Sequence, residues 1–372
     1  MDLAATLEGV IHLELGEPDF FTPPHVIEAV TRAIATGDVK YTLSRGTPQL
    51  RELIRHKLAA RNAIQASVEE IVVASGGTTA VLEILLANVA PGDGVLIPDL
   101  SWPTFALATE LAGGRVICYR LLPEEGYEPD LELLERQASS ARVLIINTPA
   151  NPTGAVFRRS TVEHLVELAR RHDLLVISDE VYEDIVFEGE HVSAANFDED
   201  GRVITVFSFS KAYAMTGWRI GYAVGTRPQA EAIVRVQEAV IACPSSVAQS
   251  AAQAALEGPR EVVEAMRDSY RVRRDAATRI LRDAGMLACE PHGTFYALAD
   301  SRAIGADGYD VARRLVIDKR VGVAPGETFG PAGAGLVRIS LATSTSELIE
   351  GVRRVVAAAR DLTTTTTGAL DK

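Results

Sequence analysis

Cysteine is scarce in this chain of 372 residues, which contains only Cys118, Cys243 and Cys289. Three scattered cysteines are too few for a disulfide framework or a zinc site. Long apolar runs are also missing, since none reaches the roughly 20 residues that a membrane-spanning helix requires. The chain does not open with a basic region followed by an apolar stretch, which is the pattern of a secretory signal. We therefore expect a soluble cytoplasmic protein with no membrane partner.

Positive charge is in short supply, because 37 Lys and Arg residues face 50 Asp and Glu residues and leave a net charge of -13. This acidic balance argues against nucleic acids or anionic membranes as principal partners. The seven histidines show no metal-ligand spacing, so we expect no metal. What remains is an ordinary globular composition, 47% hydrophobic and 23% charged, at a length that favours two domains.

Short β-rich runs alternate with helical patterns in the middle of the chain, which is typical of parallel βαβ units. Several runs are apolar at every position, as strands buried on both faces must be. Helices are expected between them, for example at Thr78–Val89 and Thr161–His172. We therefore expect one wound, mostly parallel sheet with helices on both faces. The predicted strands are Ile71–Ala74, Gly94–Ile97, Arg115–Tyr119, Val143–Asn147, Leu174–Ser178, Val203–Ser208 and Ile220–Val224.

The two ends of the chain differ from this middle. A long amphipathic, Arg-rich stretch from Pro259 to Asp283 predicts a helix that connects two bodies. Strands at Gly293–Leu298 and Gly335–Leu341 indicate a smaller α+β domain, which the first thirty residues should join because they cannot fold alone. We predict a large domain over residues 31–258 and a small domain from residues 1–30 and 259–362. Residues 363–372 should form a disordered tail.

The segment from Ser208 to Tyr222, SFSKAYAMTGWRIGY, carries the strongest chemical signal. The amine of Lys211 can form a Schiff base with an aldehyde, and a nearby cation would keep the pKa of this amine low enough to react. Hydroxyl groups together with Arg219 are what a phosphate dianion requires. An isolated lysine and arginine would more often be surface residues.

Further candidate motifs come directly after predicted strands. Ser75–Thr78 can bring backbone N–H groups of a helix N-terminus close to a phosphate, and it is not a dinucleotide motif because G-x-G-x-x-G is absent. Asn147–Gly154 and Ser178–Tyr182 follow two other strands, where turn formation or helix capping would also explain their composition. Arg338 lies in a strand between apolar neighbours, so it needs a buried partner or a substrate anion.

Taken together and in this order, these motifs resemble the class I/II aminotransferases, the aspartate aminotransferase-like pyridoxal-phosphate enzymes of fold type I. The resemblance extends from Gly16 to Arg338 and is strongest to the bacterial aspartate aminotransferase branch, through LPEEG at residues 122–126 and AMTGWR at residues 214–219. It implies an α/β fold, a large domain that binds pyridoxal 5'-phosphate and a smaller domain built from both chain ends. Lys211 would hold the cofactor as a Schiff base and transfer the substrate proton.

The resemblance also assigns the cofactor's ring. Asp179 would pair with the pyridine nitrogen and keep the ring an electron sink. Asn151 and Tyr182 would hydrogen-bond the phenolic oxygen, and Tyr182 would help to lower the pKa of the Schiff base. Trp102 would stack on the ring, although Leu100 stands where the family commonly has proline. The peptide bond before Pro152 is a candidate for the cis form.

Other positions match the family's phosphate and substrate contacts. Arg338 would clamp the substrate α-carboxylate beside Asn151, and Gly16 would let the substrate approach from the small domain. Tyr41 would reach the phosphate in the neighbouring subunit, so the protein should be a homodimer with shared active sites. The cofactor phosphate in the subunit's own site would be held by Gly76, Gly77, Thr78, Ser208 and Arg219.

The sequence thus predicts an aminotransferase that moves an amino group from an α-amino acid to a 2-oxo acid by a ping-pong mechanism. Another pyridoxal-phosphate reaction on the same scaffold, such as β-elimination or a specialised biosynthetic step, stays open because the motifs do not separate them. A non-catalytic ligand-binding protein is disfavoured, since Lys211, Asp179 and Arg338 are all present.

The identity of the amino acid is not determined, because Arg338 would read only the α-carboxylate. Arg45, four residues after Tyr41, is a candidate for binding a distal carboxylate in the neighbouring active site. The alternative is that Arg45 pairs with a surface acid, Glu17 or Glu52.

Overall fold

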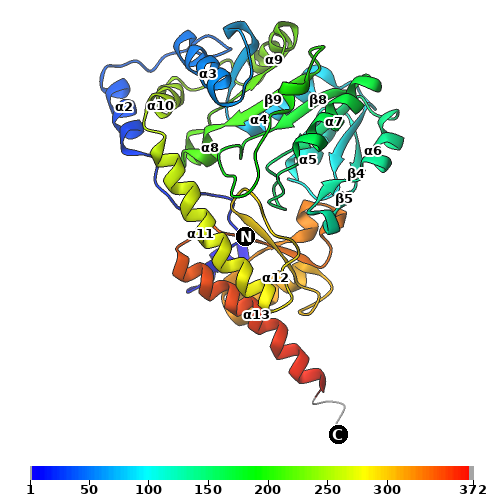
Figure 1. Cartoon of the computed structure of the whole chain (residues 1–372). Coiled ribbons are helices and arrows are strands. Elements are labelled where there is room, and N and C mark those ends of the chain that lie inside the picture. Colours follow the sequence, from blue (N-terminus) through cyan, green and yellow to red (C-terminus); the bar gives the residue numbers. More distant parts are fainter. Residues whose placement is uncertain (1, 368–372) are drawn as a thin grey trace.

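Seven strands form the central sheet of the computed structural model, which describes residues 2–367 (Figure 1). The strand order is β2-β10-β9-β8-β7-β3-β4, and only β10 runs antiparallel to its neighbours. The expected α/β class with a mostly parallel sheet is confirmed, and each predicted strand agrees with the structure to within one residue at either end. The strands are β2 Ile71–Ala74, β3 Gly94–Pro98, β4 Arg115–Tyr119, β7 Val143–Asn147, β8 Leu175–Asp179, β9 Val203–Ser208 and β10 Gly221–Val224.

Helices cover both faces of this sheet, because alternate residues of each buried strand point to opposite sides. Ile204 and Val206 of β9 pack with α4 (Gly77–Asn88) and α9 (Arg227–Val240), whereas Phe207 packs on the opposite side with other helices. We call the sheet and its helices the larger lobe. Its remaining helices are α2 Pro24–Ala35, α3 Pro48–Arg61, α5 Thr104–Leu111, α6 Leu131–Ala138, α7 Arg159–Arg171, α8 Phe209–Ala212 and α10 Ser246–Glu257.

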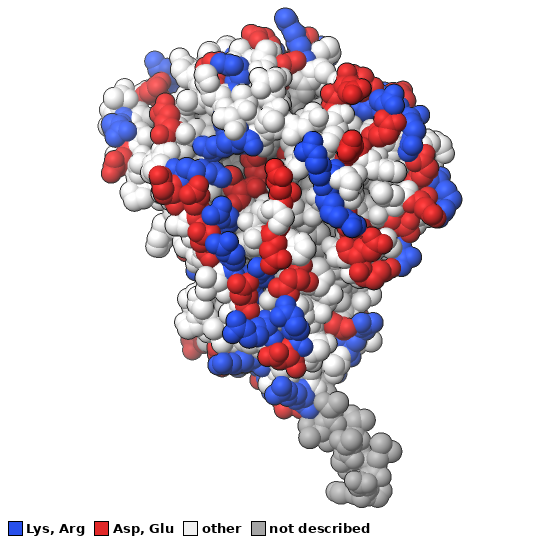
Figure 2. Space-filling view, viewed as in Figure 1, with Lys and Arg blue, Asp and Glu red and all other residues white. Residues whose placement is uncertain are grey.

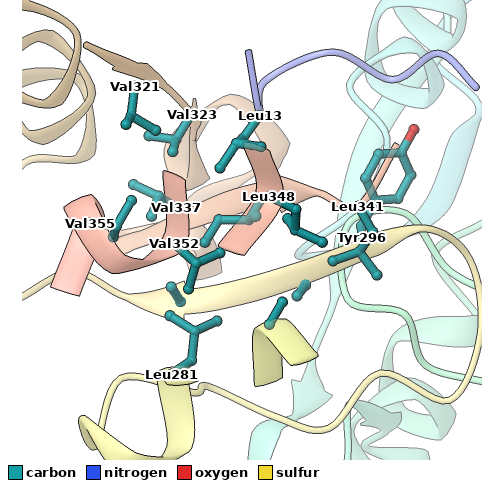
Figure 3. Close-up of a cluster of buried hydrophobic side chains, with 14 of the residues drawn as sticks. Leu13, Leu281, Tyr296, Val321, Val323, Val337, Leu341, Leu348, Val352 and Val355 are labelled. Carbon is teal, nitrogen blue, oxygen red and sulfur yellow. The ribbon is translucent and has the colours of Figure 1, made fainter. Parts of the chain in front are cut away.

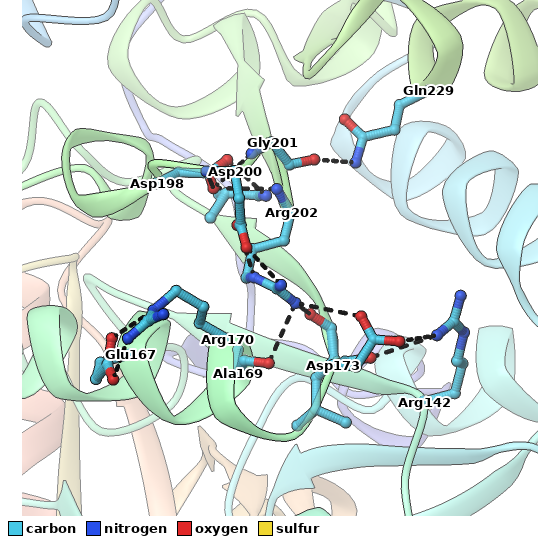
Figure 4. Close-up of polar contacts among 12 residues, drawn as sticks. Arg142, Glu167, Ala169, Arg170, Asp173, Asp198, Asp200, Gly201, Arg202 and Gln229 are labelled. Carbon is cyan, nitrogen blue, oxygen red and sulfur yellow. Dashed lines mark hydrogen bonds and ion pairs between the residues drawn. The ribbon is translucent and has the colours of Figure 1, made fainter.

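A polar network fixes the edge of the sheet at which β7, β8 and β9 begin (Figure 4). The Asp198 carboxylate accepts hydrogen bonds from the backbone N–H groups of residues 200 to 203. Arg202 pairs with Asp200 and donates to the carbonyls of Ala169 and Leu174, which links the starts of β8 and β9. The candidate functional residues lie at the opposite edge, where the strands end.

The smaller lobe contains a three-stranded antiparallel sheet in the order β11-β14-β13 (Tyr296–Asp300, Leu336–Ser340 and Ala324–Pro325). Near the N-terminus, β1 (Ile11–His12) pairs in parallel with β12 (Val321–Gly322), so the first segment of the chain joins the last. Figure 3 shows their shared core, in which Leu13 packs among Val337, Val352 and other side chains from the C-terminal part. Burial of such apolar side chains is the main force that holds the two chain ends together.

Three helices complete the smaller lobe: α11 Glu261–Asp283, α12 Gly308–Lys319 and α13 Thr345–Thr367. Helix α11, 23 residues long, runs without a break from the larger lobe into the smaller one, as the sequence predicted (Figure 1). Its exposed face carries charges of both signs, for example in the contacts of Asp268 with Arg267 and Arg271, and such mixing extends over the face in Figure 2. None of the described helices is long and apolar enough to cross a membrane.

Helix α2 corrects the expected domain boundary. Residues 1–30 were expected to join the small domain, but α2 begins at Pro24 and packs on α10 of the larger lobe. Its apolar face contributes Val26 and Val30 to a core that also contains Ala251 and Phe207. The amphipathic helix lies there because the small side chains of α10 offer it an apolar surface. Only the segment before Pro24 therefore associates with the smaller lobe.

The predicted tail overlaps the end of α13. A disordered segment was expected from residue 363, and α13 extends as a helix through Thr367. A helix that is already nucleated by packed turns adds one backbone hydrogen bond for each further residue, so extension is easier than initiation. Residues 368–372 of the expected tail lie outside the described residues.

Shorter elements connect these parts. They are α1 Asp2–Ala5, β5 Leu121–Leu122, β6 Glu128–Pro129 and the 3₁₀ helices η1 Val68–Glu70, η2 Pro123–Glu125, η3 Ala194–Phe197, η4 Thr216–Trp218, η5 Gly326–Phe329 and η6 Pro331–Gly333.

Candidate active site

A cavity of about 770 Å³ lies between the lobes, at the edge where β7, β8 and β9 end. In open α/β sheets, ligands bind outside the carboxyl ends of the strands. Most of the residues predicted to form the site line this one cavity, although they are spread over more than 300 positions of the chain. These residues are Gly16, Gly77, Thr78, Trp102, Asn151, Asp179, Tyr182, Ser208, Lys211, Arg219 and Arg338.

Lys211 lies in α8, immediately after β9. Ser208 caps this short helix by accepting a hydrogen bond from the N–H of Ser210 at 3.1 Å, which fixes the turn between strand and helix. The Lys211 Nζ donates to the carbonyl oxygen of Gly16 at 2.7 Å, and no carboxylate of the described residues forms an ion pair with it. The amine is therefore positioned but not neutralised, which leaves it available to react with a carbonyl compound.

The turn before α4 has the shape of an anion cradle. Gly76 has φ 91°, and no side chain caps the first N–H groups of the twelve-residue helix that follows. A Cβ atom at Gly76 would lie 2.7 Å from Nη2 of Arg219, so the guanidinium group rests directly on this glycine. Arg219 donates to the carbonyl of Thr216 at 2.8 Å and has no acidic partner among the described residues. The cradle thus combines helix N–H groups and a free cation, as a phosphate dianion requires.

Asp179 is the last residue of β8 and is almost completely buried. Burial raises the pKa of its carboxyl group to about 7, with a further increase from Glu180, while the N–H of Val181 and the charge of Lys211 act in the opposite direction. An ionised carboxylate at this depth is stabilised by a cation placed beside it, such as a protonated ring nitrogen. The residues around Lys211 therefore fit pyridoxal phosphate at both ends, the phosphate and the ring.

Glu180, which follows Asp179, does not line the cavity and makes structural contacts instead. Its carboxylate accepts hydrogen bonds from the hydroxyls of Ser178 and Ser193 at 2.8 and 2.9 Å and lies 3.0 Å from the His191 ring. These contacts hold the segment after β8 against the body of the larger lobe.

Arg338 in β14 lines the cavity from the smaller lobe and is 6% exposed. Its guanidinium group donates to Asn151 Oδ1 at 3.1 Å and to the carbonyl of Glu14 at 2.7 Å. It also lies over the rings of Tyr296 and Phe329, 4.2 and 4.8 Å from their centroids. The buried Nε has no hydrogen-bond partner. An arginine held by carbonyl oxygens and rings, with a donor left over, is suited to bind an anion from the cavity.

Asn151 and Tyr182 approach this arginine from the larger lobe. The bond before Pro152 is cis, which confirms the prediction, and the bond between Thr148 and Pro149 is also cis. The loop is anchored by a hydrogen bond from the N–H of Asn151 to the side chain of Asn147 at 3.0 Å. Burial and the neighbouring Tyr296 raise the pKa of Tyr182 well above its usual value, so its hydroxyl stays protonated and can donate.

Two predicted residues are placed differently from the rest. Gly76 supports the cradle without lining the cavity, and Tyr41 lies outside the cavity of its own subunit with 92% of its surface exposed. Phe21 is similarly exposed, at 95%. Arg45 forms an ion pair with neither Glu17 nor Glu52. Its Nη1 instead donates a hydrogen bond to the backbone carbonyl of Glu69 at 3.0 Å.

Apart from Gly16 and Arg338, the sequence reasoning missed the contribution of the smaller lobe. Tyr296, Tyr309, Thr328 and Phe329 line the cavity, and the Tyr296 hydroxyl lies 3.0 Å from that of Tyr182. A Cβ atom at Gly16 would come within 2.8 Å of the same Tyr296 hydroxyl, which explains the glycine at that position. The aromatic pair in the predicted strand at Gly293–Leu298 was the available signal, but the sequence did not show which lobe it faced.

Comparisons with known proteins agree with this geometry. The sequence pattern of the family described as "Aminotransferase class I and II" matches residues 8–356. The aspartate/prephenate aminotransferase of Thermus thermophilus is 39% identical over 349 residues, which are 93% of this chain and 90% of the relative. The aromatic-amino-acid aminotransferase 2 of Thermococcus litoralis is 36% identical over 360 residues, covering 95% of this chain and 92% of the relative.

Solved structures give the same result. Aspartate aminotransferase from Thermus thermophilus with maleate superposes with a TM-score of 0.90 at 39% identity, covering 94% of this chain and 91% of the other. An aromatic aminotransferase from Pyrococcus horikoshii gives 0.92 at 37% identity, with 97% and 98% covered. The chain therefore belongs to the class I and II aminotransferase family and is a pyridoxal-phosphate-dependent aminotransferase of fold type I.

Proposed function

We propose that the cavity between the lobes binds pyridoxal phosphate and an α-amino acid, and that Lys211, Asp179 and Arg338 carry the transfer of the amino group to a 2-oxo acid. One observation carries this proposal: Lys211, Arg219 and Arg338 line a single cavity, and none of them has an acidic partner among the described residues. An aldehyde, a phosphate and a carboxylate are the three groups that these cations would bind. When bound, the cofactor supplies an electron sink for the negative charge that proton loss leaves on the substrate Cα.

The phosphate would be held by the N-terminus of α4, with Gly76 and Gly77 giving the backbone its close approach. Thr78 and Ser208 line the cavity beside Arg219 and would add hydroxyl donors. The free N–H groups and the arginine charge make this end of the cavity favourable for a dianion.

Four residues would orient the ring and set its electronic state. Asp179 would pair with the ring nitrogen and hold a proton there, since a buried carboxylate is most stable beside a cation. Tyr182 and Asn151 line the same cavity and would hydrogen-bond the phenolic oxygen. Trp102 packs edge-on against Phe105, with ring centroids 5.6 Å apart, and would present its indole to the ring of the cofactor.

Arg338 would bind the substrate α-carboxylate with its fork of donors, beside the side chain of Asn151. This contact would fix Cα over the ring on the side of Lys211. The Lys211 amine would then act as a general base that takes the proton from the substrate Cα. It would afterwards act as a general acid that gives the proton to C4′ of the cofactor. The Gly16 carbonyl, which accepts from Nζ at 2.7 Å, would orient the amine for this transfer.

A labelling experiment tests the assignment of Lys211. Borohydride reduction of the yellow protein should fix the cofactor covalently on Lys211, and Lys211→Ala should keep the cofactor only non-covalently and lose proton transfer. An adduct mapped to another lysine would overturn the proposal. Following both products with a set of amino donors and 2-oxo acids separates transamination from β-elimination, which releases ammonia.

The active site would be completed by a second copy of the chain. The exposed Phe21 and Tyr41 lie on either side of α2 in the N-terminal part of the chain, and large exposed apolar side chains gathered in one segment are typical of an interface. Tyr41 would reach the cofactor phosphate of the neighbouring subunit. Mixing inactive Lys211→Ala protein with an inactive Tyr41→Ala protein should then restore activity through hybrid dimers, and a fully active monomer in sedimentation would contradict the assembly.

A further inference from the structure

We infer that Tyr309 and Thr328 select the side chain of the amino donor, and that they favour a neutral aromatic side chain over one that ends in a carboxylate. The inference rests on the proposed function, because it names the substrate class of the same cavity. Neither residue belongs to the motifs discussed above, and both come from the smaller lobe.

The two residues meet at the wall of the cavity. Tyr309 is the second residue of α12 and Thr328 lies in η5, and the Thr328 hydroxyl is 3.4 Å from the Tyr309 hydroxyl. Glu327 holds the two elements together by accepting a hydrogen bond from the N–H of Gly308 at 2.9 Å. A Cβ atom at Gly308 would overlap the carboxylate of Glu327, so the contact depends on this glycine. The pair therefore stands on a fixed part of the smaller lobe.

This wall adjoins the proposed carboxylate site. Phe329 follows Thr328 directly, and its ring lies under the guanidinium group of Arg338, 4.8 Å from the centroid. A donor whose α-carboxylate is bound by Arg338 therefore has Phe329, Thr328 and Tyr309 as neighbours beyond Cα. The Tyr309 side chain is 57% exposed, so much of its ring is free to contact a substrate.

The charges around the cavity disfavour a second carboxylate on the donor. The described side chains that line it include only three cations, Lys211, Arg219 and Arg338, and each already has a proposed partner. Glu17 also lines the cavity, has no basic partner among the described residues and accepts a hydrogen bond from the Thr216 hydroxyl at 2.5 Å. A distal carboxylate would thus lose water without gaining a cation and would also meet a like charge.

The remaining lining suits an aromatic donor instead. Beside Phe329 and Tyr309, the wall contains the apolar side chains of Val323 and Pro325, and Trp102 lines the cavity from the larger lobe. Aromatic pairs in edge-on or offset contact gain energy beyond the burial of their area. The two hydroxyls can in addition form a hydrogen bond with a phenol or an indole N–H.

Steady-state kinetics of the holoenzyme dimer tests the inference with phenylalanine, tyrosine, alanine and aspartate as donors. We expect kcat/KM for the two aromatic donors to exceed that for aspartate by about tenfold or more, and Tyr309→Ala to lower the aromatic values by about tenfold. Alanine, whose methyl group is too short to reach the wall, should change by less than about threefold. Tyr309→Phe should affect tyrosine more than phenylalanine, by about fivefold, because it removes one hydrogen bond.

Binding of unreactive acids supplies a readout that does not depend on turnover. The cofactor absorbance should report tighter binding of 3-phenylpropanoate than of succinate, and Tyr309→Ala should remove the difference. Ile317→Ala is the matched control, because Ile317 lies on the same helix, is 42% exposed and does not line the cavity.

Two results would overturn the inference while leaving the proposed function intact. One is a preference of the wild type for aspartate and succinate, and the other is an equal loss for all donors, alanine included, in Tyr309→Ala. Absence of reaction with every donor, in protein that carries its cofactor on Lys211, would instead overturn the proposed function and the inference with it.

Discussion

Glu83 is a buried carboxyl group that the proposed chemistry does not use, and replacing it should stabilise the protein in a pH-dependent way. It lies in α4, the helix whose N-terminus forms the anion cradle, and it has no exposed surface. Neither of its carboxylate oxygens has a hydrogen-bond partner. Burial alone raises its pKa from 4.5 to about 8, and no charged neighbour contributes to the shift.

The size of the effect follows from the linkage between protonation and folding. Below pH 4.5 the carboxyl is protonated in the folded and the unfolded chain, so it makes no difference to stability. Between pH 4.5 and about 8 only the unfolded chain releases the proton, and the folded state loses about 1.4 kcal/mol of stability per pH unit. The loss is therefore about 3 kcal/mol at neutral pH, approaches about 5 kcal/mol at pH 8, and becomes constant above it.

The measurement is urea unfolding of the wild type and of Glu83→Leu, from about pH 5 to about pH 9, at one protein concentration with the cofactor in excess. The variant should be more stable, by an amount that grows with pH up to about 8 and then stays constant. Glu110→Leu, on the exposed side of α5, is the matched control and should change stability by about 0.5 kcal/mol or less at every pH. A difference between wild type and Glu83→Leu that does not depend on pH would refute the reasoning.

Three further predictions concern the residues of the cavity and Arg45. Asp179→Asn should lower kcat by roughly 100-fold and retain the cofactor, whereas Arg219→Ala should mainly weaken cofactor binding. Steady-state kinetics measures the loss of kcat, and dialysis measures the loss of cofactor. Equal effects of the two substitutions in both assays would contradict these separate roles. Arg338→Ala should lower kcat/KM by roughly 100-fold for every α-amino acid and spare amines without a carboxylate, which a comparison of the two donor classes would check. Arg45→Ala should leave the ratio of kcat/KM for acidic and neutral donors unchanged, because Arg45 is bonded to the Glu69 carbonyl, and a selective loss of acidic donors would disprove this.

The sheet could be predicted from the sequence because its strands are short, apolar and separated by turns. Val143–Asn147, for example, is buried at every position, as its composition indicated. The candidate motifs also converge for a simple reason, since parallel strands such as β8 and β9 end at the same edge. The direction of β10 was not predictable, because an apolar run reads the same in either direction. Only the short connection that carries Lys211 turns β10 back beside Ser208.

The wall formed by the smaller lobe could not be predicted. Tyr309 follows an ordinary loop and Thr328 stands in a Gly-rich segment, and neither has a spacing that marks a site. They reach the cavity only because α12 and η5 pack against β14, which carries Arg338. The position of α2 could not be predicted either, because its apolar face could pack on either lobe. Its packing on α10 decides the position. Long-range packing decides these positions, and a local pattern does not contain it.

The segment from Glu14 to Gly16 shows how the two lobes could share one substrate. It follows β1 and passes between the lobes, and its carbonyl oxygens accept from Lys211 of the larger lobe and Arg338 of the smaller one, both at 2.7 Å. A carboxylate in this place would also fix the two cations, but it would neutralise them. A carbonyl supplies only a dipole, so each cation keeps its charge for a ligand. The N-terminal segment therefore sets the spacing between the amine and the arginine, and it does so without competing for the anion that the arginine is proposed to bind.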